Sequence, residues 1–273
     1  MSGVPLFSEH LADREVTESA VGDLLFNREL EALAPGLVAG ITTAPAGTFS
    51  VSASPGDQLL AAYTRLAGVV GFGAIAVPRQ IHGRDVLPVD VSVGGGDSPR
   101  VLLMGRVDGL VASEDGVLLA STAADCVPVY LLDPEARRVG LVHAGWRGAV
   151  GGILERGVTA LEGIGADRGR IRVHLGPAIC GDCYEVDRPV LEKFGRREER
   201  ALVDLRGFLA WRADELGIDP GNVTVSTYCT GCGPADLHSH RASGGEAGRM
   251  AAFTGFRRDV RGRAGRPPHQ VAS

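Results

Sequence analysis

The chain has 273 residues, of which 44% are hydrophobic and 22% charged, and its formal net charge is −5. These values are typical of a globular protein with one large or two small domains, and they exclude disordered, collagen-like and coiled-coil proteins. The body of the chain has no basic run that would displace counterions from phosphates, so we expect no nucleic-acid partner.

The expected elements begin with a lead-in over residues 1–36, which reads as irregular or partly helical. A strand is expected over 37–43, and Asp57 then opens a helix whose apolar positions have helical spacing. Short β-rich runs follow, separated by Gly, Pro and Asp, at residues 74–77, 85–91, 107–112, 117–122, 127–132 and 138–142.

The second half of the chain mixes the two kinds of element. The patterns predict helices over 148–163 and 187–194 and a third that begins at the capping residue Asp204 and ends at Leu216. Strands are expected over 171–175, 222–228 and 250–256. Because several strands follow one another without helices, we expect one mixed α/β (α+β) domain over 37–256 and no pure doubly wound sheet. Residues 257–273, with five arginines, are expected to form a basic, disordered tail.

The chain shows no feature of a secreted or membrane protein. Its first 15 residues include Glu9, Asp13 and Glu15 and lack the apolar core of a secretory signal. The uncharged stretch over residues 66–78 is too short to cross a bilayer. We therefore expect a cytoplasmic protein with no membrane partner. The sequence does not decide between a monomer and a homodimer.

Three segments place a nucleophile or a metal ligand at the end of an apolar strand, beside Gly or Pro. They read RQIHG (79–83), TAADCVP (122–128) and VHAGWRG (142–148), and they supply His82, Cys126 and His143. Each of these residues alone is more often a packed or surface residue than a ligand. As a set, two imidazoles and one thiolate suit a borderline-soft ion such as zinc, and three protein ligands leave a fourth position for water or substrate.

These three segments resemble the hallmark motifs of the laccase-domain (YfiH-type) family, whose members are named polyphenol oxidase, purine nucleoside phosphorylase and peptidoglycan editing factor. The order of the motifs also matches over residues 37–256. Further matching segments are VDGLV (107–111), LGPAI (175–179), CYEV (183–186), CT (229–230), SHR (239–241) and GRM (248–250).

The resemblance implies a layered α/β sandwich, distantly like the hydrolase domain of cytotoxic necrotizing factors. It implies that His82, Cys126 and His143 meet in a pocket, bind zinc and carry the chemistry, with copper as the weaker alternative. The implied reaction is phosphorolysis of purine nucleosides such as adenosine, inosine and methylthioadenosine, with adenosine deamination beside it. The implied partners are therefore a nucleoside and phosphate.

Candidate residues for holding the substrate or the phosphate are Gln80, Arg147 and Arg241. Arg147 lies in a Gly-flanked turn at an expected helix N-terminus, where backbone N–H groups favour an anion, although it is equally compatible with a surface arginine. Asp125, beside Cys126, either orients an imidazole of the site or serves as a turn residue.

The sequence departs from the family pattern at several positions. The arginine expected near the first strand is replaced at Ala44, and the asparagine of the next helix is replaced at Ala62. The usual FSYR segment reads HSHR at 238–241. If the missing arginine and asparagine hold phosphate or ribose, phosphorolysis is weakened or the anion is different.

The other four cysteines form two C-x-x-C pairs, Cys180 with Cys183 and Cys229 with Cys232. Two such pairs separated by a long loop are typical of a four-thiolate structural zinc site. Alternatively, Cys183 and Cys229 occupy family positions that need no second metal, and Cys180 and Cys232 are incidental.

Two other functions stay open. One is a cysteine hydrolase or amidase that edits a peptidoglycan precursor, with Cys126 as nucleophile and His143 as its base. The other is a divergent binding relative with weakened catalysis. A true multicopper oxidase is disfavoured because such an enzyme needs about ten imidazoles for its copper ions, whereas this chain has 7 histidines.

Overall fold

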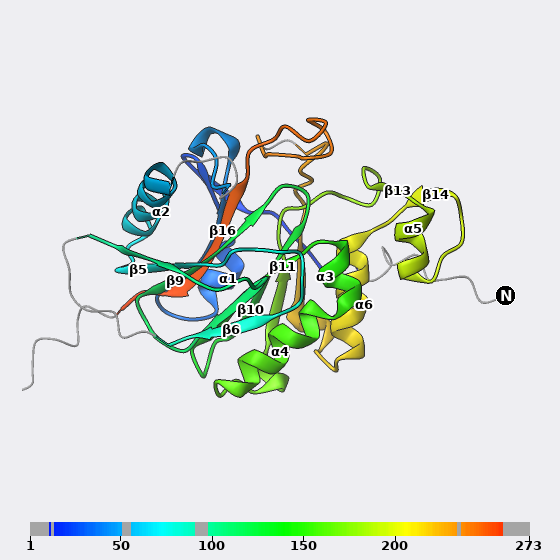
Figure 1. The fold of residues 1–273 in the computed structure, drawn as a ribbon. Helices are drawn as coiled ribbons and strands as arrows, with labels where there is room; N and C mark the ends of the chain where they lie inside the picture. The colour runs from blue at the N-terminus through cyan, green and yellow to red at the C-terminus, as the bar shows by residue number, and fades with distance from the viewer. Residues whose placement is uncertain (1–10, 12–13, 51–55, 91–97, 234–235, 259–273) are drawn as a thin grey trace, which may run out of the picture.

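The computed structural model describes residues 11, 14–50, 56–90, 98–233 and 236–258. In this part of the chain two seven-stranded sheets pack face to face, and helices cover their outer faces (Figure 1). The fold is therefore a layered α/β sandwich with two mixed sheets, which confirms the predicted fold class.

The first sheet has the strand order β1-β15-β12-β10-β11-β8-β6. Its centre is antiparallel, with β10 between β11 and β12, whereas β1, β15 and β12 run parallel to one another, as do β6 and β8. The strands are β1 (Glu15–Val16), β6 (Val86–Val89), β8 (Gly109–Ala112), β10 (Val127–Asp133), β11 (Arg138–Ala144), β12 (Arg172–Leu175) and β15 (Val223–Ser226).

The second sheet has the order β2-β3-β4-β16-β9-β5-β7. Its strands are β2 (Ser19–Val21), β3 (Leu24–Phe26), β4 (Leu37–Thr42), β5 (Ala74–Val77), β7 (Arg100–Leu103), β9 (Val117–Ala123) and β16 (Met250–Phe256). A separate antiparallel pair is formed by β13 (Glu185–Asp187) and β14 (Arg200–Leu202).

Helices cover the outer face of each sheet. Helix α2 packs on the second sheet, and α3, α4 and α6 pack on the first (Figure 1). The α-helices are α1 (Arg28–Ala32), α2 (Gly56–Val69), α3 (Trp146–Gly151), α4 (Ile153–Gly163), α5 (Arg188–Leu191) and α6 (Leu205–Glu215). The predicted cap of α6 is confirmed, because the Asp204 carboxylate accepts a hydrogen bond from the Gly207 N–H at 2.9 Å.

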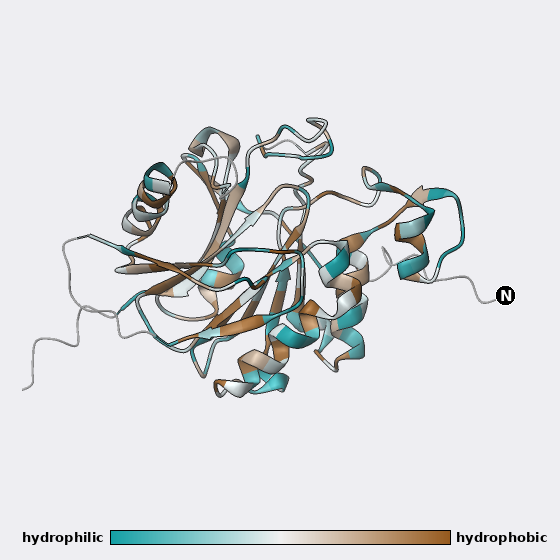
Figure 2. Ribbon diagram, in the orientation of Figure 1, coloured by the Kyte–Doolittle hydropathy of each residue, from teal (hydrophilic) through white to brown (hydrophobic). Residues whose placement is uncertain are grey.

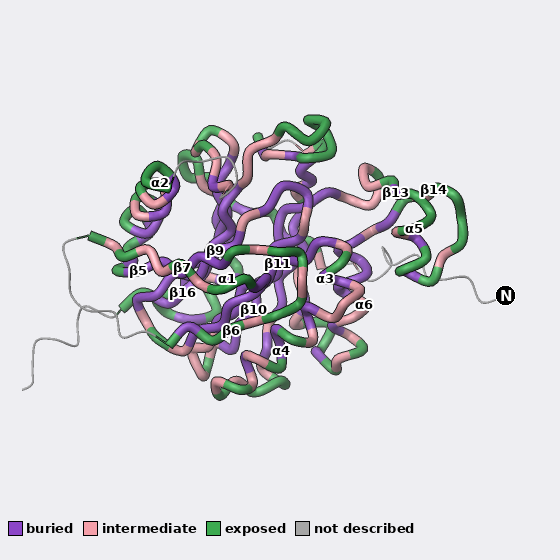
Figure 3. Tube along the Cα trace, in the orientation of Figure 1, coloured by how far each residue is buried: buried purple, intermediate pink, exposed green. Residues whose placement is uncertain are grey.

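The strands at the centre are apolar on both faces because each sheet is buried on both sides. In β10, Val129 and Leu131 point to the helices, whereas Tyr130 and Leu132 point to the second sheet. Figure 2 shows hydrophobic strands between helices whose outer faces are hydrophilic, and Figure 3 shows the same strands as buried. This explains why the sequence reads as continuous apolar runs in the middle of the chain.

Several local predictions need correction. The lead-in contains the short helix α1, as expected of a partly helical segment, but it also contains three short strands that were not expected: β1 joins the first sheet, and β2 and β3 join the second. The helix expected over 148–163 is interrupted at Gly152, whose φ of 89° is left-handed and ends α3 with an N–H bond to the Ala149 carbonyl. Strand β7, which lies at a sheet edge, was not expected.

A buried polar group fastens the lead-in to the first sheet. The Glu18 carboxylate lies 3.0 Å from Nε2 of His174 in β12 and accepts a hydrogen bond from the Ser226 hydroxyl in β15 at 2.7 Å. All three side chains are buried. The division expected at residue 36 remains a prediction, but residues 15–26 share their sheets with later strands.

No helix in the described ranges is long and apolar enough to cross a bilayer. The expected basic tail lies outside the described residues beyond Arg258. Before that point, the Arg257 N–H donates to the Gly36 carbonyl at 2.8 Å.

Candidate metal-binding and active site

His82 is held by its backbone in the loop between β5 and β6. Its φ of 58° is unusual for a residue with a side chain. The Asp108 carboxylate supports this conformation by accepting hydrogen bonds from the N–H groups of Ile81, His82 and Gly83, the last two at 2.9 and 2.7 Å. The RQIHG loop is therefore wrapped around one buried carboxylate, which leaves the His82 imidazole exposed.

His143 lies near the end of β11 and is buried. Its Nδ1 is 3.0 Å from Oδ1 of the same Asp108 carboxylate. This contact directs the other ring nitrogen, Nε2, away from Asp108 and toward the position of Cys126. Asp108 thus orients both histidines of the predicted triad, one through the ring and one through the backbone.

Cys126 lies in the short connection between β9 and β10. The preceding Asp125 has a φ of 86°, and its carboxylate accepts hydrogen bonds from the hydroxyls of Thr230 and Ser239 and from the Arg241 N–H. Asp125 therefore secures the turn that presents Cys126. Of the two interpretations of Asp125, the structure supports the turn residue, and Asp108 makes the imidazole contact.

The structure brings the three predicted ligands together. Their ligand atoms all lie within 4.8 Å of one another, and the rings of His82 and His143 meet edge to face with centroids 4.9 Å apart. Burial raises the pKa of Cys126, but the charge and hydrogen bond of His143, together with His82, outweigh it and lower this pKa to about 6. Burial lowers the pKa of His143, but the Cys126 thiolate and Asp108 raise it to about 9.

These residues fit a divalent metal ion. Two imidazole nitrogens and a thiolate are preferred ligands of zinc, and a cysteine with a lowered pKa offers the thiolate that a metal needs. The Asp108–His143 contact is the carboxylate–histidine pairing that commonly supports a metal ligand. His82, Cys126 and His143 are therefore a possible metal centre with one open position.

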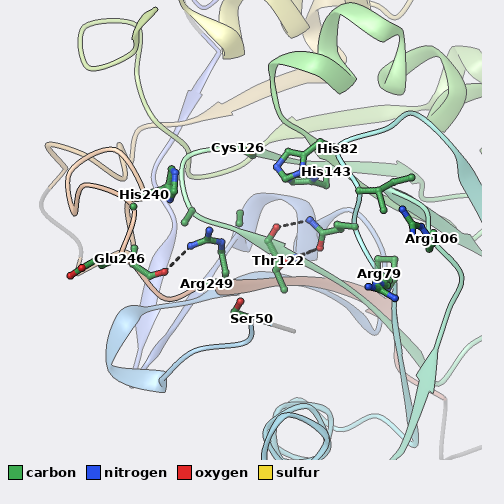
Figure 4. A pocket seen from close by; sticks show the side chains of 17 residues that line it. Ser50, Arg79, His82, Arg106, Thr122, Cys126, His143, His240, Glu246 and Arg249 are labelled. Carbon is green, nitrogen blue, oxygen red and sulfur yellow. Dashed lines mark hydrogen bonds between the residues drawn. The ribbon is translucent and has the colours of Figure 1, made fainter. Parts of the chain in front are cut away.

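The triad opens onto a cavity of about 950 Å³. Figure 4 shows His82, Cys126 and His143 together at one side of this cavity, with Arg249, Arg79 and Arg106 around it. None of these arginines forms an ion pair within the described part of the chain. The Arg249 guanidinium is fixed by the carbonyls of Ala247 and Gly248. The other labelled lining residues are Ser50, Thr122, His240 and Glu246.

Comparison with known proteins adds a family match. The family model described as "Multi-copper polyphenol oxidoreductase laccase" matches residues 38–257. The chain belongs to this family. Members of the laccase-domain family that resemble it include a purine nucleoside phosphorylase from Deinococcus radiodurans, which is 39% identical over 71% of this chain and 76% of its own length.

Two further laccase-domain relatives match much of the chain. The protein named adenosine deaminase RL5, from an unknown prokaryotic organism, is 32% identical over 67% of this chain and 75% of its own length. The crystal structure of YlmD from Geobacillus stearothermophilus superimposes with a TM-score of 0.76 at 31% identity and covers 89% of this chain and 99% of that one. The resemblance stated from the motifs is thereby confirmed.

The other predicted site residues have different surroundings. The Gln80 amide is engaged by Thr122, with its oxygen accepting from the Thr122 N–H and hydroxyl and its NH₂ donating to the Thr122 carbonyl. Arg147 is exposed and stacks over the Trp146 ring at 4.2 Å. Arg241 donates to the Glu185 carbonyl. Arg147 and Arg241 line a smaller cavity of about 260 Å³ that shares His82 and Cys126 with the larger one. A substrate-binding role for these three residues remains a prediction.

Sequence reasoning missed Asp108 as a supporting residue. It also missed Arg79 and Arg106 on the cavity wall. A signal for Asp108 was available, since it lies in the matching VDGLV segment and precedes a strand of the laccase-domain pattern. Arg79 is the first residue of the RQIHG motif, but no spacing rule places Arg106 near it. Neither replaced position lines the two cavities. The Ala44 N–H donates to the Asp236 carbonyl, and Ala62 lies within α2 and packs against the core beneath that helix.

Proposed function

We propose that this protein is a metal-dependent purine nucleoside phosphorylase acting on adenosine, inosine or methylthioadenosine, with adenosine deamination as a second reaction of the same site. The observation that carries the proposal is the cluster of His82, Cys126 and His143 in a cavity walled by arginines that form no ion pair with any described residue. The cavity volume is within the range of small-molecule sites and accommodates a nucleoside beside phosphate. The names of the laccase-domain relatives support the same reaction class.

Phosphorolysis places particular demands on the protein groups. A phosphate oxygen forms a bond to the anomeric carbon of the sugar, while the N-glycosidic bond breaks and its electron pair leaves with the purine, which then takes up a proton. Arg249 is the best-placed residue to hold the phosphate, because two carbonyls fix its guanidinium and a planar guanidinium binds phosphate in a bidentate manner. Arg79 and Arg106 add positive charge to the same wall.

The leaving purine needs a proton donor. His240 lines both the large and the small cavity and carries an exposed imidazole, so it can protonate the base as the bond breaks. His240 stands where the family usually has tyrosine, so an imidazole replaces a phenol at this position. A metal held by His82, Cys126 and His143 would polarise a substrate oxygen or activate water.

The test is a product assay on protein of measured metal content. With adenosine and phosphate we expect free adenine and ribose 1-phosphate, and without phosphate we expect inosine from deamination. Arg249→Ala should raise the KM for phosphate more than the KM for the nucleoside. The control Arg168→Ala removes a surface arginine paired with Glu162 and should change neither. Metal-loaded protein that yields no base from any of the three nucleosides would refute the proposal.

A second candidate function rests on a separate observation. Cys126, His143 and Asp108 are arranged as nucleophile, base and orienting carboxylate, and the Cys126 thiol has a pKa of about 6. This arrangement suits a cysteine hydrolase acting on an amide of a peptidoglycan precursor. Metal-free protein should then cleave such an amide and form a covalent adduct at Cys126. Amide cleavage that survives Cys126→Ser would exclude this candidate.

A further inference from the structure

Four of the five cysteines gather at a second place in the fold. Cys180 and Cys183 follow β12, and Cys229 and Cys232 follow β15. Because β12 and β15 are adjacent and parallel, the loops after them leave the same edge of the sheet. A bridge between Ala178 and Cys229 continues the pairing beyond the strands.

The sulfur atoms have the spacing of a metal site. All four Sγ atoms lie within 4.8 Å of one another, and Sγ of Cys180 is 3.8 Å from Sγ of Cys232. Zinc–sulfur bonds of about 2.3 Å in a tetrahedron separate neighbouring sulfurs by about 3.8 Å, whereas a disulfide needs about 2.05 Å. We propose that Cys180, Cys183, Cys229 and Cys232 form a four-thiolate structural zinc site, distinct from the His82–Cys126–His143 cluster.

The backbone around these cysteines is shaped for thiolates. The N–H groups of Cys180 and Gly231 point at Sγ of Cys229, at 3.2 and 3.3 Å. Such N–H···S contacts stabilise the negative charge of a metal-bound thiolate. The second C-x-x-C pair closes a turn in which the Gly233 N–H donates to the Cys229 carbonyl at 2.9 Å. A Cβ at Gly233 would lie 2.3 Å from that carbonyl oxygen, so this turn requires glycine.

A buried arginine complements the charge of such a site. Arg206 donates to the carbonyls of Ser226 and Tyr228, immediately before Cys229, and it forms no ion pair within the described part of the chain. A buried guanidinium without a carboxylate partner is costly. Four thiolates around a divalent ion carry a net charge of −2, which supplies the missing anionic partner nearby.

The site would secure the turn that presents Cys126. From the first loop, the Ile179 N–H donates to the Asp125 carbonyl at 3.1 Å. From the second, the Thr230 hydroxyl donates to the Asp125 carboxylate at 2.6 Å. Zinc that joins the two loops therefore holds Asp125 from both sides. Four protein ligands leave no open coordination position, so the role is structural.

Metal content tests the proposal without any assay of activity. The full chain is purified with a thiol reductant and without chelator, and zinc is measured by mass spectrometry. We expect two zinc ions per chain in the unmodified protein. We expect one zinc ion per chain in the double variant Cys180→Ser, Cys232→Ser, and likewise one in the double variant His82→Ala, His143→Ala. Cys126→Ser makes the same chemical change outside the cluster and is the matched control; its cluster zinc should remain.

A second measurement covers the case in which the serine variants do not fold. The His82→Ala, His143→Ala protein is loaded with Co²⁺, and the intense thiolate-to-cobalt absorption of a tetrahedral sulfur site is recorded. We expect these bands, and we expect a thiol-specific mercurial to release the ion in proportion to four thiols. One zinc per chain that disappears with His82 and His143, a Cys180–Cys232 disulfide in place of the metal, or the absence of cobalt–thiolate bands would overturn the proposal.

Discussion

Replacing Asp108 with asparagine tests the central feature of the candidate site. The side chain is fully buried and accepts hydrogen bonds from three backbone N–H groups and from His143. In Asp108→Asn one acceptor oxygen becomes an NH₂ group. In either orientation of the amide, this NH₂ faces an N–H donor of the 81–83 loop or the His143 ring.

The magnitude follows from the bonds that are lost. A hydrogen bond to a charged group contributes about 1.5–3 kcal/mol, and a buried donor left without a partner costs about 1–3 kcal/mol. We therefore expect Asp108→Asn to lower the free energy of unfolding by about 3 kcal/mol, which corresponds to a fall in Tm of about 6–12 °C. Loss of such a supporting contact also weakens metal affinity by about 10–100-fold.

Two measurements check this prediction. Urea unfolding of the metal-free protein gives the change in stability, and competition with a chromophoric chelator gives the change in metal affinity. Asp115→Asn is the matched control, because it makes the same change in a half-exposed carboxylate paired with Arg137. It should cost less than about 1 kcal/mol. An unchanged metal affinity in Asp108→Asn, or an equal loss in Asp115→Asn, would show that the carboxylate does not orient the ligands.

Three further predictions concern other features. In metal-free protein, alkylation of Cys126 should persist down to about pH 6 and decline below it, because the thiolate is the reactive form and the pKa of Cys126 is about 6. Peptide mapping measures the alkylation rate of Cys126 as a function of pH. A midpoint of this rate near pH 8.5, the ordinary thiol value, would contradict the prediction. Gly145→Ala should weaken metal binding, since its Cβ would lie 2.9 Å from Sγ of Cys126, whereas Gly163→Ala meets no atom within 4 Å and should leave titrated affinity unchanged. Glu18→Ala should lower the free energy of unfolding in urea by about 3 kcal/mol, because it leaves the buried His174 imidazole and Ser226 hydroxyl without their partner. A loss below about 1 kcal/mol would show that this contact is dispensable.

The strands were predictable where a sheet is buried on both faces. Runs such as Ala74–Val77 and Met250–Phe256 have the predicted bounds, because continuous apolar residues between turn formers have few alternatives. The three strands of the lead-in were not expected because β1, β2 and β3 are only two or three residues long, and the partner of β1 lies far away in the sequence. A local signal was available for β2 and β3, which form a hairpin around the two-residue turn Gly22–Asp23.

The ligand triad was found through its motifs and not through spacing. His82, Cys126 and His143 are separated by long intervals, and only the fold brings the three strand ends to one place. Asp108 escaped notice because a buried carboxylate before a strand resembles a turn residue in sequence. The sequence left the four-cysteine cluster undecided for a different reason. It does not show that β12 and β15 are neighbours, and this pairing is what brings the two C-x-x-C loops together.

The pairing of β1 with β15 has a consequence for how the protein is made. Glu15 lies opposite Val225, and Val16 opposite Ser226, so β1 cannot pair until β15, about 200 residues later in the sequence, has been synthesised. During synthesis the first strands emerge long before their partners, and contacts of such long range form slowly. Neither large sheet can be completed on the ribosome until most of the chain has been translated. We therefore expect the last stage of folding to begin only once β15 and β16 have been synthesised, and the unpaired early edges to be the segments that chaperones protect.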